Sequence, residues 1–147
     1  VIEHLKNPEE FMTRLKQKTE KNPNLKIITS TGNVGFLIIR LMLLFGSFNY
    51  GHRGILDKTH TRLFTFSSFK NLMVQTGFNI KRISGVPAPI PLVIGNNILS
   101  KFLLNINKFF ILISKEIFAY QIYLEIKPQI SINLLLDQAK SKAHNEE

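Results

Sequence analysis

Apolar residues recur at helical spacing soon after the start of the chain. Asn7 is suited to cap a helix, and Pro8 to occupy its first position, with acids following in the first turn. The pattern therefore predicts an amphipathic helix over residues 8 to about 20. Its apolar positions are Phe11, Met12 and Leu15.

Three further segments have the length and pattern of helices. Residues 36–45 are mostly apolar, and residues 67–76 begin at a capping Ser67 and stop at Gly77. Residues 97–118 place lysines on one side and an apolar face on the other. We interpret the apolar faces as covers for a sheet, with contact to a membrane surface as the alternative. The face of the long segment consists of Leu99, Phe102, Leu103, Ile106, Phe110, Ile113 and Ile117.

Short apolar runs between these helices predict strands. Residues 1–5 resemble the buried end of a strand running into a charged turn, without an initiator Met, which indicates a fragment of a longer chain. Residues 25–29 have the pattern of a strand buried on both faces of a parallel sheet, which would complete a βαβ unit. Residues 78–83 form the next strand. Residues 119–126 alternate, as an antiparallel strand does, and Pro128 ends it.

The remaining segments are predicted to be irregular. Residues 46–62 are polar and contain several glycines, which favours a lid and loop, and three prolines interrupt residues 84–95. Residues 1–136 would then form part of a single domain, followed by a polar tail over residues 137–147.

Composition restricts the chemistry. The 147 residues include no Cys and four His, so disulfides and thiolate metal sites are excluded. The net charge is +9, and residues 40–82 hold seven Lys or Arg against one acid, Asp57. Such a region attracts phosphates, carboxylates or acidic lipid head groups, unless it is simply a solvated basic face. No nucleic-acid-binding motif is present, so nucleic acid is not an expected partner.

Six short strings occur in a specific order along the first 85 residues. Val1-Ile2-Glu3-His4-Leu5 precedes Asn7-Pro8-Glu9-Glu10-Phe11, and Ile27-Ile28-Thr29-Ser30-Thr31 follows with Asn33. Asp57-Lys58-Thr59-His60-Thr61-Arg62 then precedes Phe64-Thr65-Phe66, and Gln75-Thr76-Gly77-Phe78 ends the series. In this order the chain resembles class I S-adenosylmethionine-dependent methyltransferases, in the broad group that includes ubiquinone-type O-methyltransferases.

The resemblance implies an α/β fold, specifically the C-terminal half of a Rossmann-like seven-stranded methyltransferase sheet whose last strand is antiparallel. The family's Gly-rich cofactor loop and its ribose-binding acid would lie before Val1, and Gly32 and Gly35 do not replace that loop. Glu3 and His4 would face the methyl group of the cofactor, S-adenosylmethionine. A Glu-His pair at this place helps to bind magnesium in some ubiquinone-type members, but two ligands are too few, so we predict no metal. Alternatively, Glu3 caps local backbone and His4 packs on a loop.

His60 is the leading candidate for a catalytic base. Methyl transfer to oxygen requires deprotonation of the acceptor hydroxyl, which a histidine beside a carboxylate can perform near neutral pH. Asp57 would orient the imidazole ring, while Arg62 and Arg53 would hold an anionic group of the acceptor. In the alternative interpretation, the same string only ties a long loop to the body. Weaker candidates for lining the acceptor pocket are Tyr50 and Asn33.

The function predicted from these observations is methyl transfer to a small-molecule or lipid-linked acceptor by the complete enzyme, of which this fragment alone would be inactive. We expect a cytoplasmic protein with peripheral membrane contact. The alternative is a noncatalytic binding module or decayed remnant, including a basic protein of the membrane surface. The oligomeric state is left open.

Overall fold

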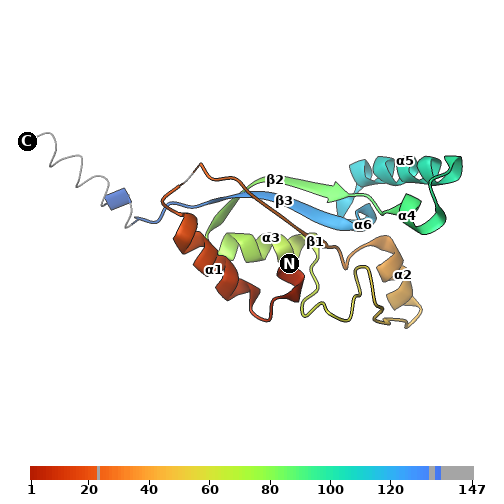
Figure 1. Cartoon of the computed structure of the whole chain (residues 1–147), viewed down its shortest axis with the longest axis horizontal. Coiled ribbons are helices and arrows are strands. Elements are labelled where there is room, and N and C mark those ends of the chain that lie inside the picture. The colour runs from red at the N-terminus through yellow and green to blue at the C-terminus, as the bar shows by residue number, and fades with distance from the viewer. Residues whose placement is uncertain (23, 133–134, 137–147) are drawn as a thin grey trace, which may run out of the picture.

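The computed structural model describes residues 1–22, 24–132 and 135–136, and it shows a mixed α/β fold. Its sheet contains β1 (Ile27–Gly32), β2 (Phe78–Val86) and β3 (Gln121–Pro128) in the order β1-β3-β2 (Figure 1). β3 is antiparallel to both neighbours, so β1 and β2 run in the same direction. The prediction that the last strand is antiparallel is confirmed, and the polar tail lies outside the described residues.

The alternating pattern of β3 sets which face of the sheet is buried. The side chains of Ile122, Leu124 and Ile126 are fully buried, whereas Tyr123 and Glu125 on the other face are only half-buried. Because successive residues of a strand point to opposite faces, β3 provides one apolar face to pack against helices. The predicted alternation is therefore confirmed.

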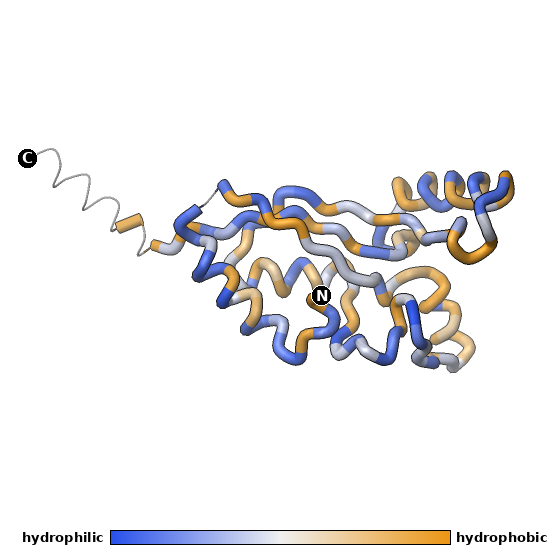
Figure 2. The backbone as a smooth tube through the Cα atoms, in the orientation of Figure 1, coloured by the Kyte–Doolittle hydropathy of each residue, from blue (hydrophilic) through white to orange (hydrophobic). Residues whose placement is uncertain are grey.

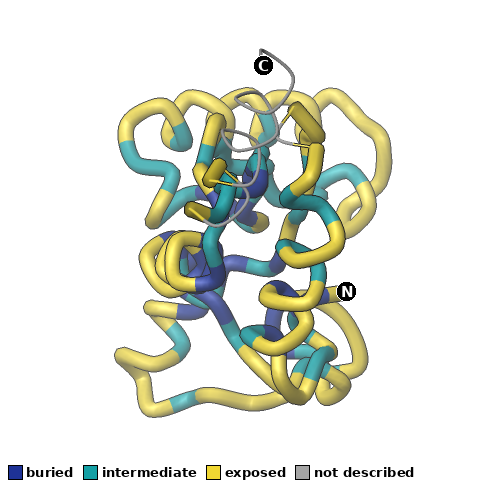
Figure 3. Tube along the Cα trace, turned by 90° about the vertical axis from the view of Figure 1, so that its left-hand side faces the viewer, coloured by how far each residue is buried: buried dark blue, intermediate teal, exposed yellow. Residues whose placement is uncertain are grey.

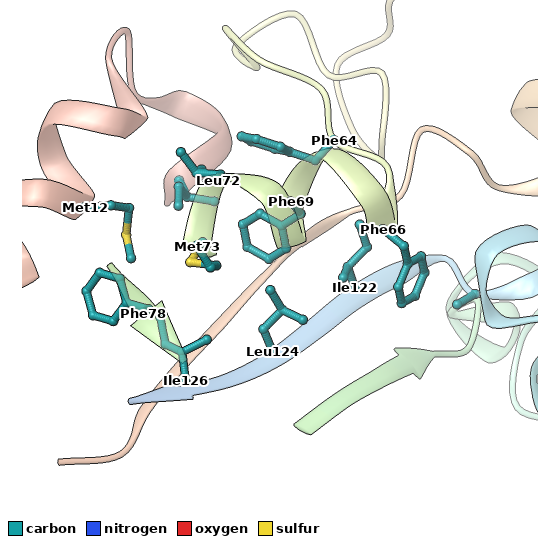
Figure 4. Packing of buried hydrophobic residues seen from close by; sticks show 12 residues of the cluster. Met12, Phe64, Phe66, Phe69, Leu72, Met73, Phe78, Ile122, Leu124 and Ile126 are labelled. Atoms are coloured by element: carbon teal, nitrogen blue, oxygen red, sulfur yellow. The ribbon is translucent and has the colours of Figure 1, made fainter. Parts of the chain in front are cut away.

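Helices α1 (Pro8–Thr19) and α3 (Phe66–Gln75) cover the apolar face of the sheet. Figure 4 shows their side chains meeting those of β3, and Figure 3 shows the buried residues gathered inside a largely exposed periphery. This core supplies most of the hydrophobic stabilisation of the fold. Its members include Ile2, Met12, Phe64, Phe66, Phe69, Leu72, Met73, Phe78, Ile122, Leu124 and Ile126.

The ends of these helices follow their capping residues. Asn7 caps α1 as predicted, because its side-chain oxygen accepts a hydrogen bond from the Glu10 amide. α3 begins earlier than predicted: its cap is Thr65, paired with Ser68 in a capping box, and not Ser67. Gly77 ends α3 with a φ of +86°, as expected of a glycine in this position.

The opposite end of the molecule contains α2 (Leu37–Leu44), α4 (Ile90–Ile94), α5 (Ile98–Ile113) and the short α6 (Lys115–Phe118). β2 continues to Val86, and α4 forms in the segment that was expected to be irregular, because proline is tolerated in the first turn of a helix. The predicted long helix is interrupted at Ser114, whose extended backbone turns the chain towards the buried Ala119.

The start of the chain departs most from the sequence prediction. Residues Ile2–His4 form a 3-10 helix (η1) and not a strand end, so the βαβ unit is absent from the described residues. Nor is β1 buried on both faces, since Ile28 is 59% exposed and β3 is antiparallel to it. A strand requires a hydrogen-bonded neighbour, and over the described ranges β1 pairs only with β3. Its other side faces a cavity of about 370 Å³ lined by residues that include Ile2, Met12 and Ile27.

Hydropathy differs between two helices, α2 and α5, at the same end of the molecule. Figure 2 shows hydrophobic residues predominating along α2 and alternating with polar ones along α5. None of the helices in the described part of the chain is long and apolar enough to cross a membrane.

Candidate functional site

The loop after α2 crosses the carboxyl end of β1. Ile55 and Leu56 are buried, and a Cβ on Gly32, the last residue of β1, would lie 3.5 Å from Ile55. Gly51 and Asp57 form an isolated β-bridge across the base of this loop. The loop was predicted to lack regular structure, and its packing shows why its position is nevertheless defined: two apolar side chains anchor it against the strand end.

Backbone hydrogen bonds tie the end of this loop to η1. The amides of Thr61 and Arg62 donate to the Glu3 carbonyl at 2.9 and 3.1 Å, and the Thr61 hydroxyl donates to the Leu5 carbonyl at 2.8 Å. Two residues of the Thr-His-x-Arg string therefore do fasten the loop to the body, as the alternative interpretation anticipated. The histidine between Thr59 and Thr61 remains available for chemistry.

Glu3, His4 and His60 come together at this junction, and we call them the His60 cluster. One potential ligand atom from each residue lies within 4.8 Å of the others, and the two imidazole rings meet edge to face with centroids 4.8 Å apart. His60 Nδ1 lies 2.8 Å from the Ile55 carbonyl oxygen, and His4 Nδ1 lies 3.1 Å from that of Thr59. Because a carbonyl only accepts, each Nδ1 carries hydrogen, and in the neutral ring Nε2 is the nitrogen with the lone pair.

Glu3 adds negative charge to the cluster. Its partial burial acts to raise the pKa of the carboxyl group, but hydrogen bonding, first of all from its own backbone N–H, outweighs this and lowers the pKa. The carboxylate is therefore ionised near neutral pH. Two neutral imidazole nitrogens beside a carboxylate can accept a proton or attract a cation.

Asp57 does not orient the His60 ring. Its Oδ1 accepts hydrogen bonds from the Thr59 amide at 2.8 Å and from the Thr59 hydroxyl at 2.7 Å, and these bonds lower the pKa of the Asp57 carboxyl group. This Asx turn is local, whereas the His60 ring is held by the Ile55 carbonyl. The structure thus gives the orienting role to a backbone group that no sequence pattern indicates.

The two arginines have separate surroundings. Arg62 forms an ion pair with Glu9 on α1 and lies over the Phe64 ring, 5.6 Å from its centroid. Arg53 instead lines a cavity of about 290 Å³ between α2 and the loop. A joint contact of both arginines with an acceptor therefore gains no support, because Arg62 already has a carboxylate partner.

Asn33 is a structural residue in this chain. Its side chain is fully buried, with Nδ2 donating to the carbonyls of Glu116 and Ala119 at 3.1 and 2.8 Å. Its Oδ1 accepts from the Gly35 amide at 2.9 Å. These bonds join the turn after β1 to the segment before β3, so Asn33 does not line a pocket. Tyr50, the other weaker candidate, is 44% exposed and packs edge to face on Phe48.

Tyr120 was not singled out as a site residue. It lines both the cavity beside Arg53 and a larger cavity of about 730 Å³, and its ring meets that of Phe36 edge to face. Burial raises the pKa of its hydroxyl group. Only the alternation before β3 placed Tyr120 on the apolar side, and that pattern does not distinguish a core residue from a cavity-lining one.

Comparison with known proteins adds no identification: no family model matches the chain, and no curated protein matches it. The functional interpretation therefore depends on the residues and their geometry.

Proposed function

We propose that this chain is part of an S-adenosylmethionine-dependent methyltransferase that acts on a small or lipid-linked hydroxyl acceptor. The observation that carries the proposal is the His60 cluster, in which two imidazoles and a carboxylate meet beside the loop packed on the carboxyl end of β1. Ligands of open α/β sheets bind outside the carboxyl ends of the strands. The position of the cluster beside such a strand end supports the proposal.

The sheet is compatible with this proposal. Its order, β1-β3-β2 with an antiparallel middle strand, suits the terminal part of a larger sheet. The exposed Ile28 and the cavity of about 370 Å³ beside β1 leave space for another strand. In the complete enzyme, a further strand would pair with the free edge of β1 and continue the sheet towards the cofactor.

The residues present fit one end of the cofactor. S-adenosylmethionine supplies an electrophilic methyl group on a sulfonium cation, and the ionised Glu3 carboxylate is suited to lie near that charge. The turn after β1 is filled by its own side chains, since a Cβ on Gly35 would lie 3.0 Å from Asn33 Oδ1. The turn therefore has no room for the rest of the cofactor. Glu3 and His4 would thus contact the methyl-bearing end only.

His60 has the geometry of a general base. Its Nδ1–H bond to the Ile55 carbonyl holds the ring, and its Nε2 lone pair can accept the proton of an acceptor hydroxyl. The neighbouring Glu3 carboxylate would stabilise the imidazolium that forms. General-base catalysis of this kind contributes roughly 100-fold to 10,000-fold in rate.

The test compares His60→Ala with His52→Ala in the complete enzyme. We expect His60→Ala to slow methyl transfer by about 100-fold near neutral pH while leaving S-adenosylmethionine affinity unchanged, with partial recovery as pH rises. His52 lies on the same loop and is exposed, so its replacement should leave both quantities close to wild type. Equal turnover of His60→Ala and wild type would remove His60 from the mechanism.

A noncatalytic binding module is the second candidate, and the amount of exposed apolar surface on α2, α4 and α5 favours it. The two candidates differ in one measurable property. A binding module would show no affinity for S-adenosylmethionine in the complete protein, whereas the methyltransferase would bind it.

A further inference from the structure

α5 presents to solvent the face that was expected to cover the sheet. Leu99, Phe102 and Ile113 belong to that face and are each about 60% exposed. The side of α5 turned towards the body instead carries Ser100, which is fully buried, and Asn107. Asn107 accepts from the Ala88 amide and donates to the Phe118 carbonyl, both at 2.9 Å. The Asn107 bonds and the packing of Ile111 on the core therefore fix the inner side of α5, and the more exposed apolar residues point outwards.

The most exposed apolar side chains form a stripe along α5 in which Asn105 is the one polar position. The spacing of Ile98, Phe102, Phe109 and Ile113 repeats at four or seven residues, which places them above one another on one side of the helix. They are between 60% and 88% exposed. With Leu112 on one side of this stripe and Leu99, Ile106 and Phe110 on the other, apolar side chains cover about half of the circumference of α5.

This stripe continues across an open groove to α4 and α2. The cavity of about 730 Å³ lies between the three helices, and its lining includes Ile38, Val93 and Phe110. Beyond it, Phe45 at the end of α2 is 82% exposed, and Leu92 on α4 is 87% exposed. We refer to the exposed surface of α2, α4 and α5 as the apolar end, which Figure 1 shows on the right.

Positive charge predominates around this surface, where Glu116 on α6 is the one acid of residues 36–56 and 86–118. Residues 36–56 and 86–115 contain no Asp or Glu, but they contain five Lys or Arg. Lys101 and Lys108 are exposed on α5, seven residues apart, along the border of the apolar stripe. A helix with a broad apolar side and bordering lysines is suited to lie in the plane of a membrane interface.

We propose that the apolar end docks onto the surface of a bilayer that contains anionic lipids, with Phe102 and Phe109 inserted below the head groups. Lys101 and Lys108 would then contact the lipid phosphates. An anionic bilayer complements both the exposed apolar side chains and the positive charge of this surface. A second copy of the chain would match only the apolar property, because five cations on each copy would face one another. The inference goes beyond methyl transfer and does not depend on it.

Vesicle sedimentation of the complete protein tests this proposal. We expect binding to phosphatidylcholine vesicles containing phosphatidylglycerol, weakening as salt rises, and much less binding to phosphatidylcholine alone. The double variant Phe102→Asp/Phe109→Asp should bind at least about tenfold more weakly. Val74→Asp is the matched control, because Val74 is 55% exposed on α3, away from the apolar end. Circular dichroism would show that each variant folds.

A second pair of variants tests the contribution of Lys101 and Lys108 to vesicle binding. Lys101→Glu/Lys108→Glu should weaken binding to the anionic vesicles by about tenfold or more, whereas Lys70→Glu on α3 should have little effect. Wild-type binding by either double variant would overturn the proposal, as would a failure of the wild type to bind anionic vesicles at low salt. A wild-type dimer that Phe102→Asp/Phe109→Asp makes monomeric, without vesicle binding, would instead identify an interface between copies and also overturn it.

Discussion

The two ends of the molecule use equally apolar sequences in opposite ways. In the body, the apolar side chains of β3 meet α1 and α3, and Ile122 and Leu124 are fully buried. At the apolar end, the corresponding side of α5 is open, and Phe102 and Phe109 are each 60% exposed. The comparison shows that periodicity identifies an apolar face, but only a packing partner determines whether that face becomes core.

The two ends also differ in how buried polar residues contribute to their packing. Asn107 on the inner side of α5 bonds to the backbone of neighbouring segments, and Asn33 does the same after β1, whereas Ser100 bonds to Asn97 in the capping box of α5. Buried polar groups require such partners. At the apolar end these bonds act together with a small apolar cluster around Phe36 and Ile39, whereas the large core positions the elements of the body.

The sharpest test of the contrast replaces one phenylalanine in each region. Phe69→Ala should lower the free energy of unfolding by about 4 kcal/mol, because Phe69 is fully buried in the core. Phe109→Ala should change it by less than about 0.5 kcal/mol, because its side chain is already in solvent. Denaturant unfolding of both variants measures the difference. Similar losses would mean that α5 is packed more tightly than its exposure indicates.

The next largest effect concerns Asn33. Asn33→Ala should destabilise the protein by about 3 kcal/mol, since it leaves two carbonyls and one amide without their buried partner. Asn71→Ala on the exposed side of α3 is the matched control and should be close to neutral. Denaturant unfolding again provides the measurement. A neutral Asn33→Ala would show that the turn after β1 does not depend on this side chain.

A smaller effect is expected for the ion pair between Arg62 and Glu9. Both side chains are close to half exposed, so solvent screens their attraction, and the coupling should be about 0.5 kcal/mol or less. A double-mutant cycle with Arg62→Ala and Glu9→Ala measures it, at low and at high salt. If Arg62 instead binds an acceptor, its replacement would raise KM while stability stays unchanged.

The smallest effect is the response of the loop to acid. Hydrogen bonds from Thr59 lower the pKa of Asp57 in the folded state below its ordinary value of 3.8. The carboxylate therefore favours the native turn above about pH 4, and this contribution is lost as pH falls through the native pKa. The protection factor of the Thr59 amide against hydrogen exchange should fall over that range. Asp57→Asn should remove most of this dependence, and an unchanged dependence would assign it to another group.

Local signals in the sequence predicted the local features correctly. The cap at Asn7, the stop at Gly77 and the alternation of β3 depend on neighbouring residues, and all three are confirmed. Features that depend on distant partners were wrong. Residues 1–5 form η1 because no strand pairs with them, and the apolar face of α5 is open because the Asn107 bonds and the packing of Ile111 hold its other side.

The candidate site followed the same rule. The motif order singled out Glu3, His4 and His60, and the structure brings these three together. Asp57 was expected to pair with His60, but its hydrogen-bond partner is Thr59. Arg62 was expected to hold an anionic group of the acceptor, but it pairs with Glu9. The role of the Ile55 carbonyl could not be predicted, since every residue carries the same backbone group.

Binding of S-adenosylmethionine to the complete protein, measured by titration calorimetry, tests the central claim most directly. The account predicts saturable binding that S-adenosylhomocysteine competes for, weaker binding in Glu3→Gln and unchanged binding in His60→Ala. The weakening follows from the loss of the Glu3 carboxylate near the sulfonium charge. No binding by the wild-type protein, with the fold verified, would contradict the proposed methyl transfer.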